Sequence, residues 1–178
     1  MPGFAWYYLQ KGTTLRKNAM AALQPKGEIG KFETPTEKDV VIRPDQLKGN
    51  RWLIAIIGTE DRSKFTPTIL NIYKQSKDEF LPNILFLTGL EMGESIPIVS
   101  QQLKLPSDNP KWLICYFAKE HLFPFSKDAF NIIDTYANKS CVMLVDENLQ
   151  IRNTYLLSED SDVKQLVRHY PVFLSLKK

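Results

Sequence analysis

The sequence lacks a pair of closely spaced cysteines. Its 178 residues include two cysteines, Cys115 and Cys141, and each lies inside an apolar run typical of a strand. Two thiols that exchange a mixed disulfide must lie near each other, so this spacing argues against a dithiol oxidoreductase. We expect two free, unreactive thiols that behave as small hydrophobic side chains. The even number leaves a disulfide open in an oxidising compartment, because sequence alone does not place two α-carbons within bonding range.

Other kinds of site are also missing. The chain has no Gly-rich phosphate loop, no nucleophile elbow and no carboxylate pair that stands apart from surface charge. Its two histidines, His121 and His169, are 48 residues apart; we expect a structural role for His121 and a helix-terminal cation or surface residue at His169. The net charge is +3, but the basic residues are scattered among acidic ones. This distribution argues against a nucleic-acid partner.

The apolar start of the chain is too short to cross a membrane. Residues 1–12 carry eight mostly apolar residues followed by basic ones, whereas a bilayer span takes roughly 20 residues. The segment also lacks the layout of a signal peptide. Two interpretations remain: an amphipathic arm packed on the domain, or the outer end of a membrane anchor that lies upstream. Aromatic residues followed by Lys11, Arg16 and Lys17 suit a bilayer interface.

A strand, a helix and a second strand form the recognisable centre of the sequence. Residues 51–57 are aliphatic and β-rich, which favours a strand buried on both faces. Apolar spacing predicts a helix over residues 66–80, with Thr66 as its cap and Pro67 in its first turn, and residues 84–88 form the next strand. This order predicts a right-handed crossover between parallel strands. Ligands bind beyond the carboxyl ends of such strands, so we expect any chemistry at residues 58–67.

The remaining segments complete one α/β domain, for which the length and the 43% of apolar residues suffice. Pro124 predicts that the helix within residues 119–130 is broken or short, and Pro171 is expected to stop the last helix. We expect a hairpin or two short strands at 32–47, a helix at 95–103, strands at 111–117, 141–145 and 151–156, the last two antiparallel, and a helix at 160–170.

Four phrases of the sequence resemble the Sco/SenC family of copper chaperones for cytochrome oxidase. They are G-E-I-G-K-F-E, D-Q-L-K-G-N-R-W-L-I-A-I-I, P-S-D-N-P-K-W-L-I-C-Y-F-A-K-E, and the segment from C-V-M-L-V-D-E-N-L to the last helix. The resemblance implies a thioredoxin-like fold: a central mixed sheet of about five strands flanked by helices, with an N-terminal hairpin and extension. It predicts a Sco/SenC-type domain over residues 31–178 and a membrane-proximal extension over residues 1–30.

The family's copper ligands have no counterparts in this sequence. The family uses a Cys, three residues, a Cys-Pro and a distant His, a donor set that suits soft Cu(I). Alignment on Thr66-Pro67 puts Arg62 at the first cysteine and Thr66 at the second, and the histidine falls near Asn138. None of the three supplies a thiolate or an imidazole. We therefore expect a degenerate site that holds no metal and no cofactor.

The loop at this position is charged, with Glu60, Asp61, Arg62 and Lys64 at the head of the helix. A solvated surface loop is the simpler interpretation. The alternative is a site for an anion, or for an acidic segment of a partner, at the helix amino terminus.

These residues favour a noncatalytic role. We expect an assembly or protein-interaction module with an unknown protein partner, outside the cytoplasm and anchored to a membrane, as the family resemblance implies. The alternative is a thiol-dependent oxidoreductase or copper carrier that uses Cys115 or Cys141 in a site unlike the family's.

Overall fold

The computed structural model describes residues 2–80 and 82–177. The strands are β1 (Gly27–Glu28), β2 (Thr34–Pro35), β3 (Val41–Ile42), β4 (Trp52–Ile57), β5 (Asn83–Leu90), β6 (Trp112–Ala118), β7 (Cys141–Val145) and β8 (Gln150–Leu156). The helices are α1 (Pro2–Ala22), α2 (Pro44–Leu47), α3 (Arg62–Phe80), α4 (Ile96–Leu103), α5 (Lys119–Ala129) and α6 (Asp160–Leu174).

The main sheet is mixed and has the order β1-β8-β7-β4-β5-β6. The strands β4, β5 and β6 are parallel, whereas β7 is antiparallel to both β4 and β8. The parallel pairing predicted for the crossover and the predicted final hairpin are therefore confirmed. Five long strands and the two-residue β1 make up this sheet, and β2 pairs with β3 as the predicted N-terminal hairpin.

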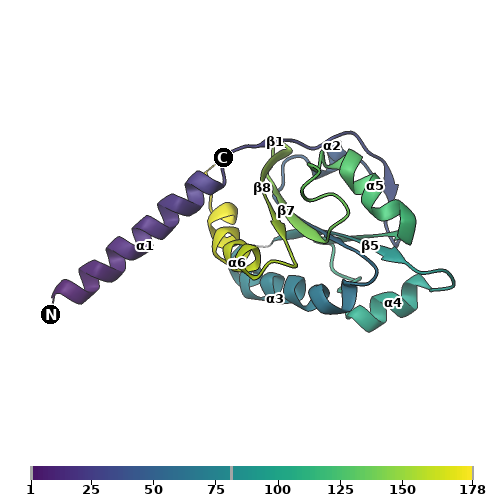
Figure 1. Ribbon diagram of the computed structural model, residues 1–178, viewed down its shortest axis with the longest axis horizontal. Helices are drawn as coiled ribbons and strands as arrows, with labels where there is room; N and C mark the ends of the chain where they lie inside the picture. The colour runs from purple at the N-terminus through teal and green to yellow at the C-terminus, as the bar shows by residue number, and fades with distance from the viewer. Residues whose placement is uncertain (1, 81, 178) are drawn as a thin grey trace.

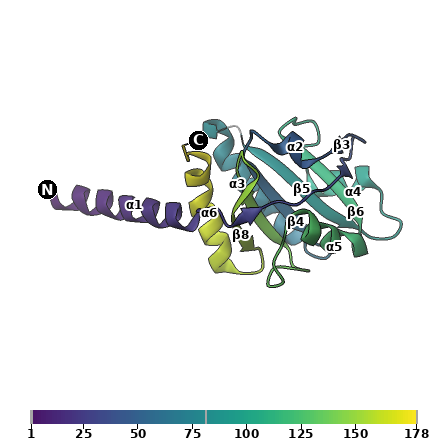
Figure 2. The same ribbon diagram turned by 90° about the horizontal axis from the view of Figure 1, so that it is seen from above.

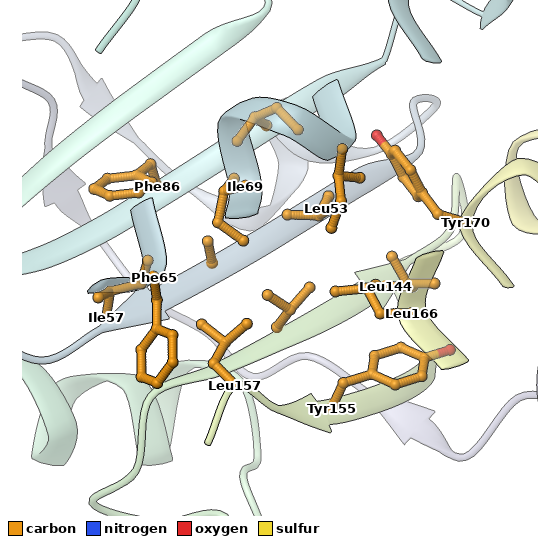
Figure 3. Packing of buried hydrophobic residues seen from close by; sticks show 14 of the residues in the cluster. Leu53, Ile57, Phe65, Ile69, Phe86, Leu144, Tyr155, Leu157, Leu166 and Tyr170 are labelled. Atoms are coloured by element: carbon orange, nitrogen blue, oxygen red, sulfur yellow. The ribbon is translucent and has the colours of Figure 1, made fainter. Parts of the chain in front are cut away.

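Helices cover both faces of the sheet, so the molecule has three layers (Figure 1). The side chains of β4 alternate between two cores: Leu53, Ala55 and Ile57 face α3, α4 and α6, whereas Ile54 and Ile56 face α5. Burial on both faces explains why this strand is a continuous apolar run rather than an alternating one. Figure 3 shows the first core, where side chains of β4, α3, β7 and α6 meet.

Three prolines that we expected to begin, break or stop helices lie inside continuous helices. Pro67 is in α3, Pro124 in a continuous α5, and Pro171 in α6, which runs on to Leu174. A proline removes the N–H that would bind the carbonyl four residues earlier. Here each proline is exposed, and water can bind the freed carbonyl, which lowers the cost. Those carbonyls belong to exposed residues: Ser63, Glu120 and Val167.

The helix α3 therefore starts earlier than predicted. Its first turn begins at Arg62, because the Asp61 carbonyl accepts hydrogen bonds from the amides of Lys64 and Phe65. Thr66 is not a cap but lies buried in the second turn. The expectation of a helix starting at Thr66 was wrong for this reason.

The N-terminal segment is helical and projects from the domain (Figures 1 and 2). Its last turn packs against α6, and Ala19 and Leu23 are buried there, whereas the aromatic residues near its start are exposed. The domain boundary at residue 30 stays a prediction, although Leu23 and β1 both belong to the packed part of the molecule.

Replacing a core side chain of α3 tests this packing. We expect Ile69→Ala to lower the free energy of unfolding by about 2–5 kcal/mol, because Ile69 is fully buried in the first core. The exposed Ile98 of α4 provides the matched control, and Ile98→Ala should change stability by less than about 0.5 kcal/mol. Urea titration measures both values, and equal effects would contradict the assigned packing.

Candidate functional site

The candidate site lies where the parallel strands end. Because β4, β5 and β6 run in the same direction, their carboxyl ends meet at one edge of the sheet. This arrangement brings together three charged residues that follow different strands. The ammonium group of Lys119 lies 3.1 Å from the Glu60 carboxylate and 2.8 Å from the Glu91 carboxylate. All three side chains are exposed, so they form a charged surface at this edge.

A serine hydroxyl closes the loop between β4 and α3. Ser140 immediately precedes β7, whose first residues lie beside the end of β4. The amide of Gly58 donates a hydrogen bond to Ser140 Oγ (2.9 Å), and Ser140 Oγ donates one to Asp61 Oδ2 (2.7 Å). The amide of Asp61 also binds the Gly58 carbonyl at 3.0 Å. The polar groups of this loop therefore bind one another.

Two glycines allow the segments at this edge to approach closely. A Cβ at Gly89 would lie 2.3 Å from Thr59 Oγ1 and 3.3 Å from the Lys119 Cα. A Cβ at Gly58 would lie 3.0 Å from the Phe123 ring. A side chain at Gly89 would force Thr59 and the backbone at Lys119 to shift, whereas one at Gly58 would press on the Phe123 ring, so the two glycines favour the close approach of the loop to β5 and α5.

The Arg62 guanidinium already binds other groups of the protein. Its guanidinium donates a 2.8 Å hydrogen bond to the Gly89 carbonyl and forms an ion pair with Glu94. The Arg62 side chain is only 11% exposed. The hydrogen bond from Arg62, together with one from the Glu91 amide, holds the pKa of Glu94 below its ordinary value. An anion at this helix terminus would have to displace Glu94 from Arg62.

The other predicted positions differ in their surroundings. Thr66 is buried, and within the described part of the chain its hydroxyl has no hydrogen-bond partner. Asn138 has a φ of 59°, the left-handed conformation that asparagine tolerates, in the turn that leads to β7. Lys64 is exposed, with its ammonium 4.9 Å from the centre of the Phe65 ring. Arg62 and Thr66 are one helical turn apart, and Asn138 is two residues from Ser140, so all three belong to this edge.

The two cysteines lie apart from each other and, although Cys141 directly follows Ser140, neither side chain is part of the polar network at this edge. The pairing register places Cys141, Ile56, Leu87 and Cys115 in one row across four adjacent strands. Three strand spacings separate the two cysteines by about 14 Å, too far for a disulfide. Both side chains face the α5 layer, whereas α3 covers the opposite face.

Burial also makes the thiols unreactive. Desolvation raises the pKa of the Cys141 thiol to about 12. Desolvation, with a smaller contribution from the nearby Glu37 carboxylate, raises the pKa of Cys115 to about 12. The thiolate is the nucleophile and the metal ligand, and almost none exists at neutral pH.

The two histidines also lie in different parts of the domain. His121 is exposed on α5, whereas Nδ1 of His169 lies 2.8 Å from the Tyr155 hydroxyl at the far side of the domain. Among the described residues, no group of three or more His, Cys, Asp or Glu side chains could hold a metal ion.

Four residues of this site were not predicted from the sequence: Ser140, Glu91, Glu94 and Lys119. Each is polar and lies next to or near the end of a strand or helix, which is the signal that could have found them. Their partners are far away in the sequence, so only the order of strands in the sheet reveals the pairs.

The comparisons with known proteins concern the fold. No protein-family model matches the sequence, and comparison with curated protein sequences gives no match either. Yeast Sco1 with copper bound has a TM-score of 0.61 at 15% identity, covering 87% of this chain and 97% of that one. BsSco, a member of the Sco family of cytochrome c oxidase assembly proteins, has a TM-score of 0.60 at 17% identity, covering 86% and 98%.

A SCO1/SenC family lipoprotein from Bacillus anthracis has a TM-score of 0.56 at 16% identity, with 80% and 92% covered. Thioredoxin-like oxidoreductases also match at low identity. The chain has a Sco-like thioredoxin fold. At these identities the likeness establishes the fold alone.

Removing the Ser140 hydroxyl tests the closed loop. We expect Ser140→Ala to destabilise the protein by roughly 1–3 kcal/mol, because the buried Gly58 amide and the Asp61 carboxylate would each lose a partner. The exposed Ser63 offers a control with the same chemical change, and Ser63→Ala should be nearly neutral. Chemical denaturation measures the difference, and equal stabilities of the two variants would argue against the network.

The ion pair of Arg62 predicts a specific acid dependence. A lowered folded-state pKa means that Glu94 stabilises the protein above the unfolded-state pKa of about 4.3. This stabilisation is lost as the pH falls through the lower folded-state value. We expect Glu94→Gln to cost about 1 kcal/mol at pH 7 and progressively less below about pH 4.3. Urea titrations of both proteins across this range provide the test, and a pH-independent difference would disprove the assignment.

Proposed function

We propose that this chain is a noncatalytic Sco-like domain that works as an assembly or protein-interaction module, without copper or dithiol chemistry. The observation that carries the proposal is that hydrogen bonds and ion pairs among the protein's own residues fill the loop at the carboxyl end of β4. The Gly58 amide, the Ser140 hydroxyl and the Asp61 carboxylate bind one another, and Arg62 binds Glu94.

The donor set at this edge does not fit a Cu(I) ion. We propose that Arg62, Thr66 and Asn138 stand where the family has its copper ligands. A guanidinium, a hydroxyl and an amide are poor partners for a soft ion, which prefers thiolates and imidazoles. The yeast Sco1 structure is described as copper-bound, but that property belongs to yeast Sco1.

The two cysteines give little support to the alternative function. A thiol-dependent oxidoreductase or copper carrier would need Cys115 or Cys141 to be reachable. Both are fully buried, with their pKa values raised to about 12. Their separation across four strands also prevents one thiol from resolving an intermediate formed on the other.

The charged surface at the sheet edge is the part of this site that a partner can reach. The Glu60 side chain is 82% exposed, and Glu91 and Lys119 are also accessible. Exposed residues of mixed charge can set the orientation and the specificity of a protein partner. We propose that a protein partner binds at this surface.

We further propose that the domain works outside the cytoplasm and is anchored to a membrane. The support is the likeness to a protein described as a lipoprotein. No helix within residues 2–80 and 82–177 has the length and apolar character that spanning a bilayer requires. The proposed setting therefore rests on the fold comparison and on the aromatic and basic residues of the N-terminal segment.

Copper titration combined with thiol labelling tests the noncatalytic role. We expect the folded protein to bind no stoichiometric Cu(I) and to react slowly with a thiol reagent, because both thiols are buried and protonated. Yeast Sco1 serves as the positive control for copper. The same protein unfolded in guanidinium should expose two rapidly reacting thiols. One tightly bound Cu(I), lost in Cys115→Ser or Cys141→Ser, would instead establish the alternative function.

A further inference from the structure

The start of α1 exposes a cluster of large apolar side chains. We call Phe4, Trp6, Tyr7, Tyr8 and Leu9 the aromatic tip, and all five are exposed. At 100° per residue these positions point around the whole circumference of the helix. A helix that is apolar all round needs an apolar environment on every side. The domain does not provide one, because α1 projects away from it (Figure 2).

The charged residues of the same segment are all basic. The first 27 residues contain four of the 23 basic residues of the chain, Lys11, Arg16, Lys17 and Lys26, and none of its 20 acidic residues. The overall charge of +3 thus comes from this one segment. A cationic segment next to an aromatic one matches a surface that is both apolar and anionic.

A groove between α1 and α6 continues this cationic surface. It has a volume of about 530 Å³. Its lining includes Arg16 of α1 and Arg168 and His169 of α6, with Leu15 and Val172 as apolar walls. Among the described residues, no acidic side chain lines it. In the described part of the chain, neither Arg16 nor Arg168 has a carboxylate within ion-pair distance, unlike Arg51, Arg62 and Arg152.

The histidine in this groove is held in place by the domain. The Tyr155 hydroxyl binds His169 Nδ1, which fixes the ring at the wall of the groove. Partial burial, with repulsion from Lys26 and Arg168, lowers the pKa of His169. An anion in the groove would offset this repulsion and raise that pKa.

We propose that α1 and this groove dock on a membrane surface that contains anionic phospholipids. The aromatic tip enters the interface, and the groove takes a lipid phosphate. The dimensions agree: six residues of helix are about 9 Å long, and interfacial segments penetrate about 5–10 Å. Arg16 lies seven residues beyond Leu9, about 10 Å farther along the helix, at the level of the headgroups. In this arrangement the described part of α1 places its aromatic tip at the interface and its basic residues among the headgroups.

A second copy of this chain fits the surface less well. Two α1 helices packed together would bring two sets of the same basic residues against each other, with no acidic partner on either side. Like charges in contact destabilise such a pair.

Tryptophan fluorescence provides a direct test on the full chain. Trp6 is 65% exposed, whereas Trp52 and Trp112 are only 5% and 4% exposed, so a change of polarity reports on Trp6. We expect vesicles that mix phosphatidylcholine with phosphatidylglycerol to shift the emission to the blue. Vesicles of phosphatidylcholine alone should bind far more weakly.

Charge variants distinguish binding at the groove from general electrostatic attraction to the anionic vesicles. We expect Arg16→Gln with Arg168→Gln to weaken binding to the anionic vesicles by roughly 10- to 30-fold. The control is Lys38→Gln with Lys104→Gln, which removes the same charge from exposed positions outside the α1–α6 groove. These four residues are exposed, so both double variants should fold. Equal weakening by the two pairs, or equal binding to neutral vesicles, would overturn the proposal.

Two further outcomes identify other occupants. Inorganic phosphate alone should shift the His169 resonances only weakly, and tight binding of free phosphate in the absence of lipid would overturn the proposal of a membrane surface. Lipid-independent dimers in sedimentation experiments, abolished by Phe4→Ser with Leu9→Ser, would assign the tip to a second copy instead. This inference deepens the proposed membrane setting, whereas the copper and thiol experiments test the noncatalytic role separately.

Discussion

The burial of β4 on all sides is the constraint on which the rest of the structure depends. Its two faces pack into separate cores, and its two edges pair with β5 and β7. A strand enclosed in this way leaves polar groups only at its ends. At its amino end, Arg51 binds Glu147 and the last carbonyls of α6, which stabilises that helix terminus. At its carboxyl end, the polar groups gather around Gly58 and Ser140.

The sequence predicted most strands and helices because their apolar patterns follow directly from this burial. The run from Trp52 to Ile57 is continuous because both of its faces are covered, and the final hairpin alternates more because β8 is partly exposed. The predictions for the helices that contain the three prolines were wrong. Local preference treats a proline as a helix breaker wherever it stands, whereas Pro67, Pro124 and Pro171 are tolerated because their helices expose them. The residues before Pro67 and Pro171, Thr66 and Tyr170, are buried, so core packing overrides the local preference against helix.

The location of the candidate site could be predicted, but not its connections. A strand, a helix and a parallel strand place a loop at a known edge, so the order of elements in the sequence is enough to select residues 58–67. The partners could not be predicted, because Asp61 and Ser140 are 79 residues apart and Arg62 and Glu94 are 32 apart. Charge alone suggested an anion site at Arg62. The structure instead gives Arg62 a partner of its own, and this difference depends on the position of the turn after β5.

The distribution of paired and unpaired charges separates the two ends of the molecule. At the sheet edge, Arg62 and Lys119 each have carboxylate partners within the same chain, so their fields are largely cancelled before a ligand arrives. Along α1 and its groove, Arg16 and Arg168 have none in the part of the chain that the structure describes, so their field extends into solvent. The field of the basic side chains is therefore weaker at the sheet edge, where a thioredoxin-like fold places its chemistry, than along α1. The positive field that remains uncancelled therefore lies along α1 and its groove, on the side of the molecule opposite to the paired charges.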